Sequence, residues 1–379
     1  MRPRIFRGRF FCWTSPIMQR SIYVRPVGIF PAPAGADDEH AWSGLPLAGQ
    51  PLRFAAVEIV ERVGARVMRR LASVGDAFER DWGRHNLQAS ALMEAITAPR
   101  ARLARMALDT PRIMGIVNVT PDSFSDGGRF SSTQAAIEHA LKLAEDGADI
   151  LDIGGESTRP GADTVPVEEE LARVIPVIEG LRPHTQALIS IDTRKAEVMR
   201  RAAAAGADIL NDVSALTYDP ESLAVAAASG LPVILMHAQG DPKTMNDNPR
   251  YSDVVLDVFD FLESRIEACG AAGIPRAKLV ADPGIGFGKH LHHNVAVMGN
   301  LALYHALGVP ILLGASRKKL IDHISDVPQA KDRVPGSLAA ALTGAAQGVQ
   351  IVRVHDVAAT RQALAVWRAA NAGSQDGLA

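Results

Sequence analysis

Short apolar runs recur along the chain from Pro111 onward. Each is followed by a turn rich in Gly, Asn and Asp, and then by an amphipathic stretch. The runs are continuously apolar rather than alternating, which is typical of parallel strands buried on both faces. The pattern predicts eight βα units. The eight predicted strands span residues 113–119, 150–154, 188–192, 209–213, 233–237, 279–282, 311–314 and 351–355.

Amphipathic stretches between these runs carry the signals of helix boundaries, in particular Gly just after the last apolar position. The string that begins at Asp146, Asp-Gly-Ala-Asp-Ile-Leu, is nearly repeated from Ala205, and each copy leads from a helix end into a strand. This repetition indicates an internal echo of the βα unit. The best-signalled helices are predicted over residues 133–146, 167–180 and 195–205.

Eight consecutive βα units favour a (β/α)8 TIM barrel, an α/β fold that occupies about 250 residues. An open, doubly wound sheet is the alternative, but no G-x-G-x-x-G turn follows the first predicted strand. We therefore predict a barrel over residues 111–372 and a short tail over 373–379.

The chain before Pro111 has a weaker pattern. We predict strands over residues 21–30 and 52–62, joined by a linker rich in Pro, Gly and Ala over 32–50. A stretch rich in Ala, Leu and Arg over 86–108 predicts a helix that Pro99 interrupts. We thus expect an N-terminal extension of mixed strand and helix over 21–110.

The first 20 residues contain several Arg and no acidic residue, and their apolar run is too short for a secretory signal. We predict that residues 1–20 are disordered or precede a true start at Met18. An organellar transit peptide is the alternative. The role of the extension itself stays open between packing on the barrel, extending a dimer interface and docking another enzyme.

The composition is that of an ordinary globular protein, with 47% hydrophobic residues, 22% charged residues and a net charge of −2. It gives no sign of nucleic-acid binding, and no apolar run is long enough to predict a membrane span. The only two cysteines, Cys12 and Cys269, lie far apart and outside any C-x-x-C pattern. They suggest neither a disulfide framework nor a zinc site, so a reducing, cytoplasmic location is expected.

Polar side chains cluster where the predicted strands end, and barrel enzymes place their working residues at those ends. A single Asp there is often only a helix cap, and a single His is usually an ordinary polar residue. Eight strand ends that all offer hydrogen-bonding groups are harder to explain as caps. The polar strings follow the strands at residues 118–128, 154–161, 192–194, 211–212, 236–237, 282–289, 316–318 and 353–356.

These groups suit an aromatic heterocycle with a phosphorylated tail. Carboxylates and an amide can accept paired bonds from a ring edge rich in N–H donors. Cations on the last two strands suit a phosphate, and a thioether and an aromatic ring can cover ring faces. The ring-edge candidates are Asp192, Asn211 and Asp282, the cations are Lys318, Arg353 and His355, and the covering residues are Met236 and Phe287.

The strings at 118–128, 154–161, 190–193, 282–289, 316–318 and 353–356 resemble the signature segments of dihydropteroate synthases, in the same order and at similar spacing. The resemblance extends from about Pro111 to the C-terminus and does not cover the first hundred or so residues. It implies a TIM barrel that condenses 6-hydroxymethyl-7,8-dihydropterin pyrophosphate with p-aminobenzoate in folate biosynthesis, yielding 7,8-dihydropteroate and pyrophosphate. It also implies a homodimer, small-molecule substrates and a sulfonamide target, although sensitivity to sulfonamides is not predicted.

The resemblance assigns roles to particular residues. It implies that pyrophosphate and its Mg²⁺ are held by Asn118, Arg353 and His355, with Asn118 as the metal ligand. One departure is Lys319, at a position where some members carry Ser, which leaves details of the p-aminobenzoate contacts open. The implied pterin pocket comprises Asp192, Asn211, Met236, Asp282 and Lys318, and the implied p-aminobenzoate site comprises Thr158, Arg159, Pro160, Phe287 and Lys318.

The mechanism expected from these residues is dissociative. Asn118, Arg353, His355 and Mg²⁺ stabilise the departing pyrophosphate, and the aniline nitrogen then attacks a pterin-methylene cation. The loop after the first strand folds over that cation, where Asp122 stabilises positive charge.

Two rival interpretations are a pterin-binding methyltransferase, expected to lack the long loops, and a non-catalytic paralogue. The presence of Lys318, Arg353 and His355 argues against the paralogue.

Overall fold

The computed structural model describes residues 22–32, 44–79, 86–119, 129–157, 163–240, 244–245 and 247–372. The predictions for residues 1–20 and 373–379 lie outside these ranges. The same holds for four predicted site residues, Asp122, Thr158, Arg159 and Pro160.

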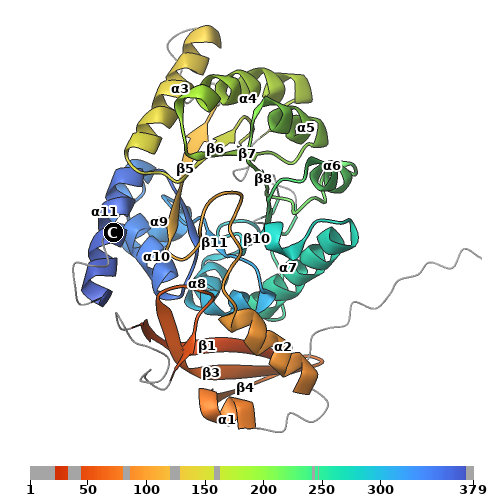
Figure 1. Ribbon diagram of the computed structural model, residues 1–379, viewed down its shortest axis with the longest axis vertical. Coiled ribbons are helices and arrows are strands. Elements are labelled where there is room, and N and C mark those ends of the chain that lie inside the picture. Colours follow the sequence, from red (N-terminus) through yellow and green to blue (C-terminus); the bar gives the residue numbers. More distant parts are fainter. Residues whose placement is uncertain are drawn as a thin grey trace, which may run out of the picture.

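Eight parallel strands form the predicted barrel (Figure 1). They follow one another in hydrogen-bonded order from β5 to β10, and β12 and β11 continue the sheet on the far side of β5. A parallel bridge between Ala281 and Ile311 joins the two ends of the sheet. The barrel fold is therefore confirmed, and the open sheet is excluded. The strands are β5 (Arg112–Asn118), β6 (Ile150–Gly154), β7 (Leu188–Asp192), β8 (Ile209–Asp212), β9 (Val233–Met236), β10 (Leu279–Asp282), β11 (Leu312–Leu313) and β12 (Ile351–Val354).

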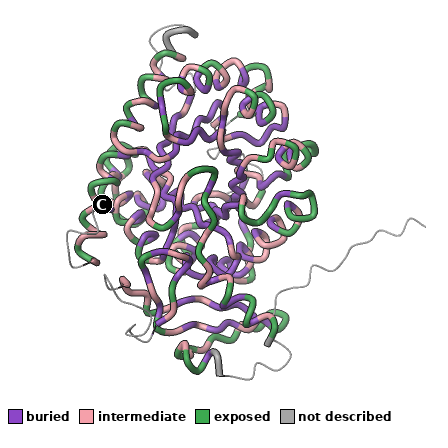
Figure 2. The backbone as a smooth tube through the Cα atoms, viewed as in Figure 1, coloured by how far each residue is buried: buried purple, intermediate pink, exposed green. Residues whose placement is uncertain are grey.

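Helices surround the strands, and Figure 2 shows that the strands are buried while the outer faces of the helices are exposed. Helix α5 ends at the predicted residue, Ala205. The next residue, Gly206, adopts a left-handed conformation with φ +108°. The α-helices are α3 (Arg129–Glu145), α4 (Val167–Leu181), α5 (Ala196–Ala205), α6 (Ser222–Ser229), α7 (Val254–Ala271), α8 (Leu291–Gly299), α9 (Lys319–Ser325), α10 (Val334–Ala346) and α11 (Val357–Ala372). Short 3₁₀ helices are η3 (Arg182–His184), η4 (Arg276–Lys278), η5 (Leu301–Leu307) and η6 (Ala330–Asp332).

The predicted helix over 86–108 is too long. Helix α2 (Asn86–Thr97) ends two residues before Pro99, which lacks an N–H and disfavours a helical residue in front of it. The chain then crosses the N-terminal end of the barrel, as the orange trace in Figure 1 shows. Leu103 and Leu108 pack there against the first residues of the strands, so this segment closes the bottom of the barrel core.

The rest of the extension is a four-stranded antiparallel sheet with one short helix. Strands β1 and β3 were predicted, whereas β4 was missed because its three arginines hide the alternation. A turn at Gly64, with φ +58°, joins β3 to β4, and β4 pairs only with β3, so its charges suit an edge strand. The elements are β1 (Ile22–Pro31), β2 (Leu45–Pro46), β3 (Leu52–Val63), β4 (Arg66–Ser73) and α1 (Val74–Glu79).

The extension packs against the barrel beside α7 and η5 (Figure 1). Tyr23 of β1 is fully buried and meets Phe259 of α7 edge to face, with ring centroids 5.5 Å apart. All seven residues of η5 are buried, in contact with β1 and α2. This apolar junction attaches the sheet firmly to one side of the barrel.

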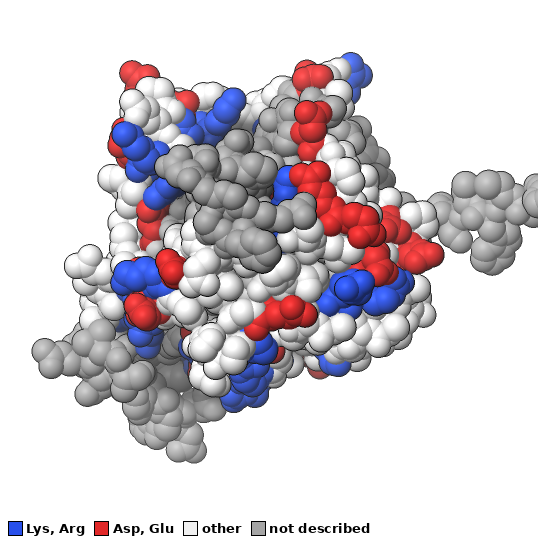
Figure 3. Space-filling model, turned by 90° about the horizontal axis from the view of Figure 1, so that it is seen from above, with Lys and Arg blue, Asp and Glu red and all other residues white. Residues whose placement is uncertain are grey.

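On the face drawn in Figure 3, lysines and arginines lie next to aspartates and glutamates. Within the described ranges, no helix combines the length and the apolar character that a membrane span requires.

Candidate active site

Arg353 lies at the centre of the residues that the strand ends bring together. From β12, its Nε donates to Asp152 Oδ2 at 2.6 Å, and its Nη2 donates to Asp192 Oδ2 at 2.8 Å. Asn211 of β8 donates from Nδ2 to both oxygens of Asp152, at 3.3 and 3.2 Å. Predicted site residues from three strands therefore meet around one carboxylate that was not predicted.

Asp152 is the residue of this cluster that the sequence did not single out. It sits inside the apolar strand β6 with a fully buried side chain, and residues two apart on a strand face the same way, so it points inward above Ile150. The available signal was a charge within an otherwise apolar run, since a buried charge requires a partner. Which partner it has depends on the barrel, because Arg353 is 201 positions away along the chain.

Burial changes the charge state of this cluster. It raises the pKa of Asp192 to about 7, with the nearby Asp152 adding to the rise and Arg353 opposing it. For Arg353, burial works against the charged form, but Asp152 and Asp192 more than offset it, and the pKa lies above its usual value. Arg353 thus stays charged, while Asp192 exchanges its proton near neutral pH.

Asp192 also has an unsatisfied oxygen. Its Oδ1 is buried and has no hydrogen-bond partner among the described residues. A buried acceptor without a donor costs about 1–3 kcal/mol. A ligand that brings an N–H group to this position would recover that free energy.

Lys318 and Phe287 lie together at the ends of the neighbouring strands. The Lys318 Nζ is 4.5 Å from the centroid of the Phe287 ring and donates to the carbonyl of Ile285. Burial lowers the pKa of Lys318 to about 8, although the carboxylate of Asp282 acts in the opposite direction. A cation over an aromatic face next to a carboxylate can hold a flat ligand with acceptor groups.

Asp282 shapes the loop that carries Phe287. Its Oδ1 accepts the backbone N–H of Gly284 at 2.7 Å, directly after β10. Gly284 has φ +69°, and a Cβ there would lie 1.9 Å from the carbonyl oxygen of His237, so only glycine fits. Burial raises the pKa of Asp282. The Asp-Pro-Gly string after β10 is thus a structural requirement as well as a predicted binding element.

Lys289 holds the same loop, which follows β10, through hydrogen bonds to its backbone. Its buried Nζ donates to the carbonyls of Gly284 at 2.9 Å and Phe287 at 3.1 Å, and it lies 2.8 Å from His237 Nδ1. Burial lowers the pKa of Lys289 to about 7, and burial together with Lys289 holds the pKa of His237 well below its usual value. His237 is therefore neutral, and its Nδ1 accepts the hydrogen bond.

His355 and Asn118 lie at the ends of β12 and β5. His355 is oriented by Ser316, whose Oγ accepts the His355 backbone N–H at 3.2 Å and lies 3.0 Å from Nδ1. Asn118 is half-buried and pairs in register with Gly154. Met236, also predicted, is buried at the end of β9 opposite Asp282.

The flanks of the loop after β6 are held by a buried ion-pair network. Glu156 binds Arg194 at 3.1 Å and Lys195 at 3.0 Å, and it accepts the backbone N–H of Val165 at 2.9 Å. Burial would raise the pKa of Glu156, but these donors outweigh it and the pKa lies below its usual value. Lys195 also pairs with Glu170 of α4. The network fixes both ends of the segment that contains the predicted p-aminobenzoate residues.

No cluster of three or more His, Cys, Asp or Glu side chains suited to a metal ion occurs in the described part of the chain. Mg²⁺ commonly binds through one or two protein oxygens together with substrate phosphates and water. The amide oxygen of Asn118 fits that pattern, so the described residues are compatible with a metal shared with a phosphorylated substrate.

Comparisons with known proteins agree with this geometry. A family model described as "Pterin binding enzyme" matches residues 114–355. The dihydropteroate synthase of Escherichia coli K12 is 49% identical over 262 residues, which cover 69% of this chain and 92% of the relative.

Two solved structures from Xanthomonas albilineans are also similar. The dihydropteroate synthase with 4-aminobenzoic acid has a TM-score of 0.68 and 53% identity, and the match covers 72% of this chain and 98% of that one. The same enzyme in complex with 7,8-dihydropteroate has a TM-score of 0.66 and 49% identity, covering 72% and 99%. The family match begins at residue 114 and leaves the N-terminal sheet outside.

Proposed function

This chain belongs to the dihydropteroate synthases, which are pterin-binding enzymes, and from that premise we propose which of its residues carry the reaction. The reaction condenses 6-hydroxymethyl-7,8-dihydropterin pyrophosphate with p-aminobenzoate. The bond between the pterin methylene carbon and the pyrophosphate oxygen breaks, a carbon–nitrogen bond forms, and the arylamine loses a proton. Dihydropteroate and pyrophosphate are the products.

The pterin pocket is the part of the proposal with the most direct support, which is the partnerless Oδ1 of Asp192. A pterin presents amino and ring N–H groups along one edge, and these would satisfy that oxygen. Asn211 and Asp282 add further polar groups from neighbouring strands, and Met236 covers a ring face. Lys318 completes the predicted pterin set from the opposite side of the barrel mouth.

Pyrophosphate is assigned to Arg353, His355 and Asn118. Arg353 uses Nε and Nη2 to bind carboxylates, while its Nη1 makes no hydrogen bond within the described ranges. Ser316 sets the orientation of the His355 ring. When bound, Mg²⁺ would supply positive charge against the departing pyrophosphate, with Asn118 as its protein ligand. These side chains hold the leaving group and stabilise its charge as the bond breaks.

p-Aminobenzoate is assigned to Phe287 and Lys318, together with Thr158, Arg159 and Pro160 of the loop after β6. The Phe287 ring offers a flat surface, and the Lys318 ammonium can pair with a carboxylate.

Asp122 is proposed to stabilise the pterin-methylene cation, and Asp122→Asn should therefore lower turnover far more than pterin affinity. Equal losses in both quantities would contradict that role.

The test is pyrophosphate release by the full chain supplied with the pterin pyrophosphate, Mg²⁺ and p-aminobenzoate. Release should depend on p-aminobenzoate and fall about ten- to a hundredfold in Lys318→Ala, since a hydrogen-bonded charge contributes roughly 1.5–3 kcal/mol. The matched control is Lys331→Ala, an exposed lysine in η6. No release by the wild type, with pterin binding intact, would favour the non-catalytic paralogue.

Three broader features remain proposals. We propose a homodimer by analogy with symmetric oligomers of this fold. A cytoplasmic location is proposed from the two widely separated cysteines. We also propose the division of the chain into an extension over 21–110 and a catalytic barrel over 111–372.

A further inference from the structure

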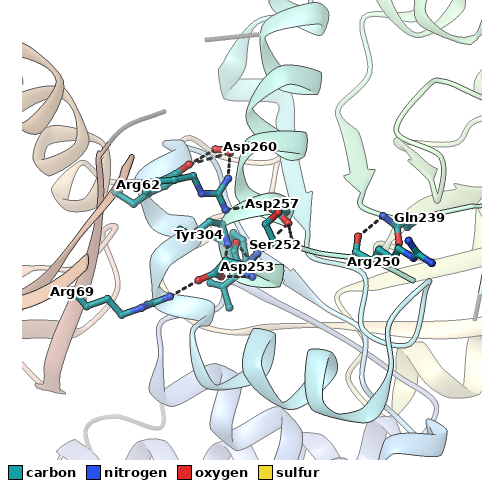
Figure 4. Close-up of polar contacts among 12 residues, drawn as sticks. Arg62, Arg69, Gln239, Arg250, Ser252, Asp253, Asp257, Asp260 and Tyr304 are labelled. Carbon is teal, nitrogen blue, oxygen red and sulfur yellow. Dashed lines mark hydrogen bonds and ion pairs between the residues drawn. The ribbon is translucent and has the colours of Figure 1, made fainter. Parts of the chain in front are cut away.

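The N-terminal sheet reaches the barrel through polar contacts as well as through its apolar junction. Arg62 of β3 donates to Asp257 Oδ1 at 2.7 Å and to Asp260 Oδ2 at 3.2 Å, and Arg69 of β4 donates to Asp253 Oδ2 at 2.7 Å (Figure 4). All three carboxylates belong to the start of α7 or its first two turns. This is the helix that follows the loop after β9.

Asp253 and Asp257 each divide their two oxygens between the extension and the barrel. Asp253 caps α7, since its Oδ1 accepts the N–H groups of Val255 and Leu256 while its Oδ2 faces Arg69. Asp257 Oδ2 accepts the Ser252 N–H at 2.7 Å while its Oδ1 faces Arg62. The arginines of the extension therefore hold the same two side chains that fix where the loop ends and the helix begins.

That loop leads directly to the active site. Gln239 exchanges two hydrogen bonds with the backbone of Arg250, at 3.0 and 2.9 Å, which closes the loop on itself (Figure 4). The next residue, Tyr251, donates from its hydroxyl to the carbonyl of Gly288 at 2.7 Å. Gly288 follows Phe287, and a Cβ on it would lie 2.4 Å from the Gln239 carbonyl oxygen, so the two loops are in close contact.

We propose that the N-terminal extension positions the p-aminobenzoate side of the active site, and that Arg69 is a positioning residue for it. The contacts run from Arg69 to Asp253, then through the adjoining Ser252 and Tyr251 to Gly288 and Phe287. This inference rests on the proposed function, because it assigns a role in binding the second substrate of that same reaction.

The physical basis is preorganisation. A binding loop that is disordered before the ligand arrives must be ordered at the expense of affinity, and fixing one residue costs about 1–2 kcal/mol. Contacts that hold the loop beforehand remove part of that cost. The effect falls mainly on the substrate that binds against Phe287, because the chain of contacts ends there. Of the proposed pterin residues, Asp192 and Asn211 lie on β7 and β8, outside this chain of contacts, so binding of the pterin should change less.

Arg69 can be removed without detaching the extension. Its side chain is 37% exposed, and the apolar junction of Tyr23 with Phe259 and η5 does not involve it. Arg62 is a poorer target because its side chain is only 4% exposed, and loss of a buried charge would destabilise the whole junction. Arg70, the next residue on β4, is equally exposed at 37% but pairs with Glu61 inside the extension.

The experiment compares Arg69→Met with Arg70→Met in the full chain. We expect Arg69→Met to raise the KM for p-aminobenzoate about two- to fivefold, as the modest strength of a partly exposed ion pair implies. The value of kcat should stay unchanged, and the KM for the pterin substrate should rise less than that for p-aminobenzoate. Arg69→Lys keeps the positive charge, so its KM for p-aminobenzoate should stay close to the wild-type value. Arg70→Met should leave all three constants as in the wild type. Tyr251→Phe should raise the same KM, and its combination with Arg69→Met should be less than additive.

A second readout is amide hydrogen exchange over residues 284–289, which should be faster in Arg69→Met than in Arg70→Met. An unchanged KM and unchanged exchange in Arg69→Met would overturn the inference, as would equal changes in both variants. If the wild type released no pyrophosphate, the proposed function would fail, and the exchange comparison would still decide whether the extension orders this loop.

Discussion

Replacing Asp152 with Asn tests whether the buried cluster at the barrel mouth is assembled around that carboxylate. Asp152 is fully buried and binds Arg353 at 2.6 Å, while Arg353 keeps a second partner in Asp192. Breaking a buried ion pair by neutralising one partner costs about 3–5 kcal/mol. Since Arg353 retains Asp192, and Asn can still accept one hydrogen bond, we expect a loss of about 2–4 kcal/mol in the free energy of unfolding.

The measurement is thermal and urea unfolding of the ligand-free protein at pH 8. The expected loss corresponds to a fall in Tm of roughly 5–15 °C for a domain of this size. Asp146→Asn, which removes a partly exposed carboxylate paired with Lys142, should change the free energy of unfolding by less than about 0.5 kcal/mol.

Asp152→Asn has a second expected consequence. Asp152 contributes to the raised pKa of Asp192, so its neutralisation should bring that pKa below about 7. The carboxylate of Asp192 would then persist to lower pH. An unchanged Tm together with an unchanged pH dependence of pterin binding would refute the reasoning, because both follow from the same buried charge.

Three further outcomes are expected. Because the ionised form of Asp192 accepts the pterin N–H groups and its pKa is about 7, the Kd of 6-hydroxymethylpterin measured by calorimetry should rise roughly tenfold from pH 8 to pH 6. Asp192→Asn should bind more weakly and lack that dependence, and a flat wild-type profile would contradict the assignment. Lys289→Met removes the donor that joins two carbonyls of the loop after β10, so kcat/KM for p-aminobenzoate should fall about ten- to a hundredfold. An unaltered value would show that Lys289 does not hold this loop in its binding conformation. Deleting residues 1–98 uncovers η5, whose residues are all buried, and should cause aggregation visible by size exclusion; a soluble and fully active product would show that the extension is dispensable.

Much of the barrel was predictable because its signals are local. Short, mostly apolar runs, each followed by a Gly-rich turn and an amphipathic stretch, indicate a buried parallel strand and its covering helix. The predicted strands 150–154, 188–192 and 279–282 match β6, β7 and β10 residue for residue. Polar residues at strand ends identify one face of the barrel as the site, because all parallel strands end on that face.

Local signals failed where partners are distant along the chain. The edge strand β4 was missed because pairing with β3, not its own alternation, makes it a strand. The predicted helix over 86–108 was too long because the segment after Pro99 is held by the barrel bottom rather than by helical hydrogen bonds.

By itself, the sequence determined the barrel, the face that carries the chemistry and most of the residues expected to bind the two substrates. Only the tertiary structure decided that Asp152 anchors Arg353 and Asn211, that Lys289 lies against a neutral His237, and that Arg69 meets Asp253 across the junction. The reason is physical. Strand and helix formation follows from the period of apolar residues, whereas the pairing of a buried or half-buried charge depends on which distant segments the closed barrel brings within a few ångströms of it.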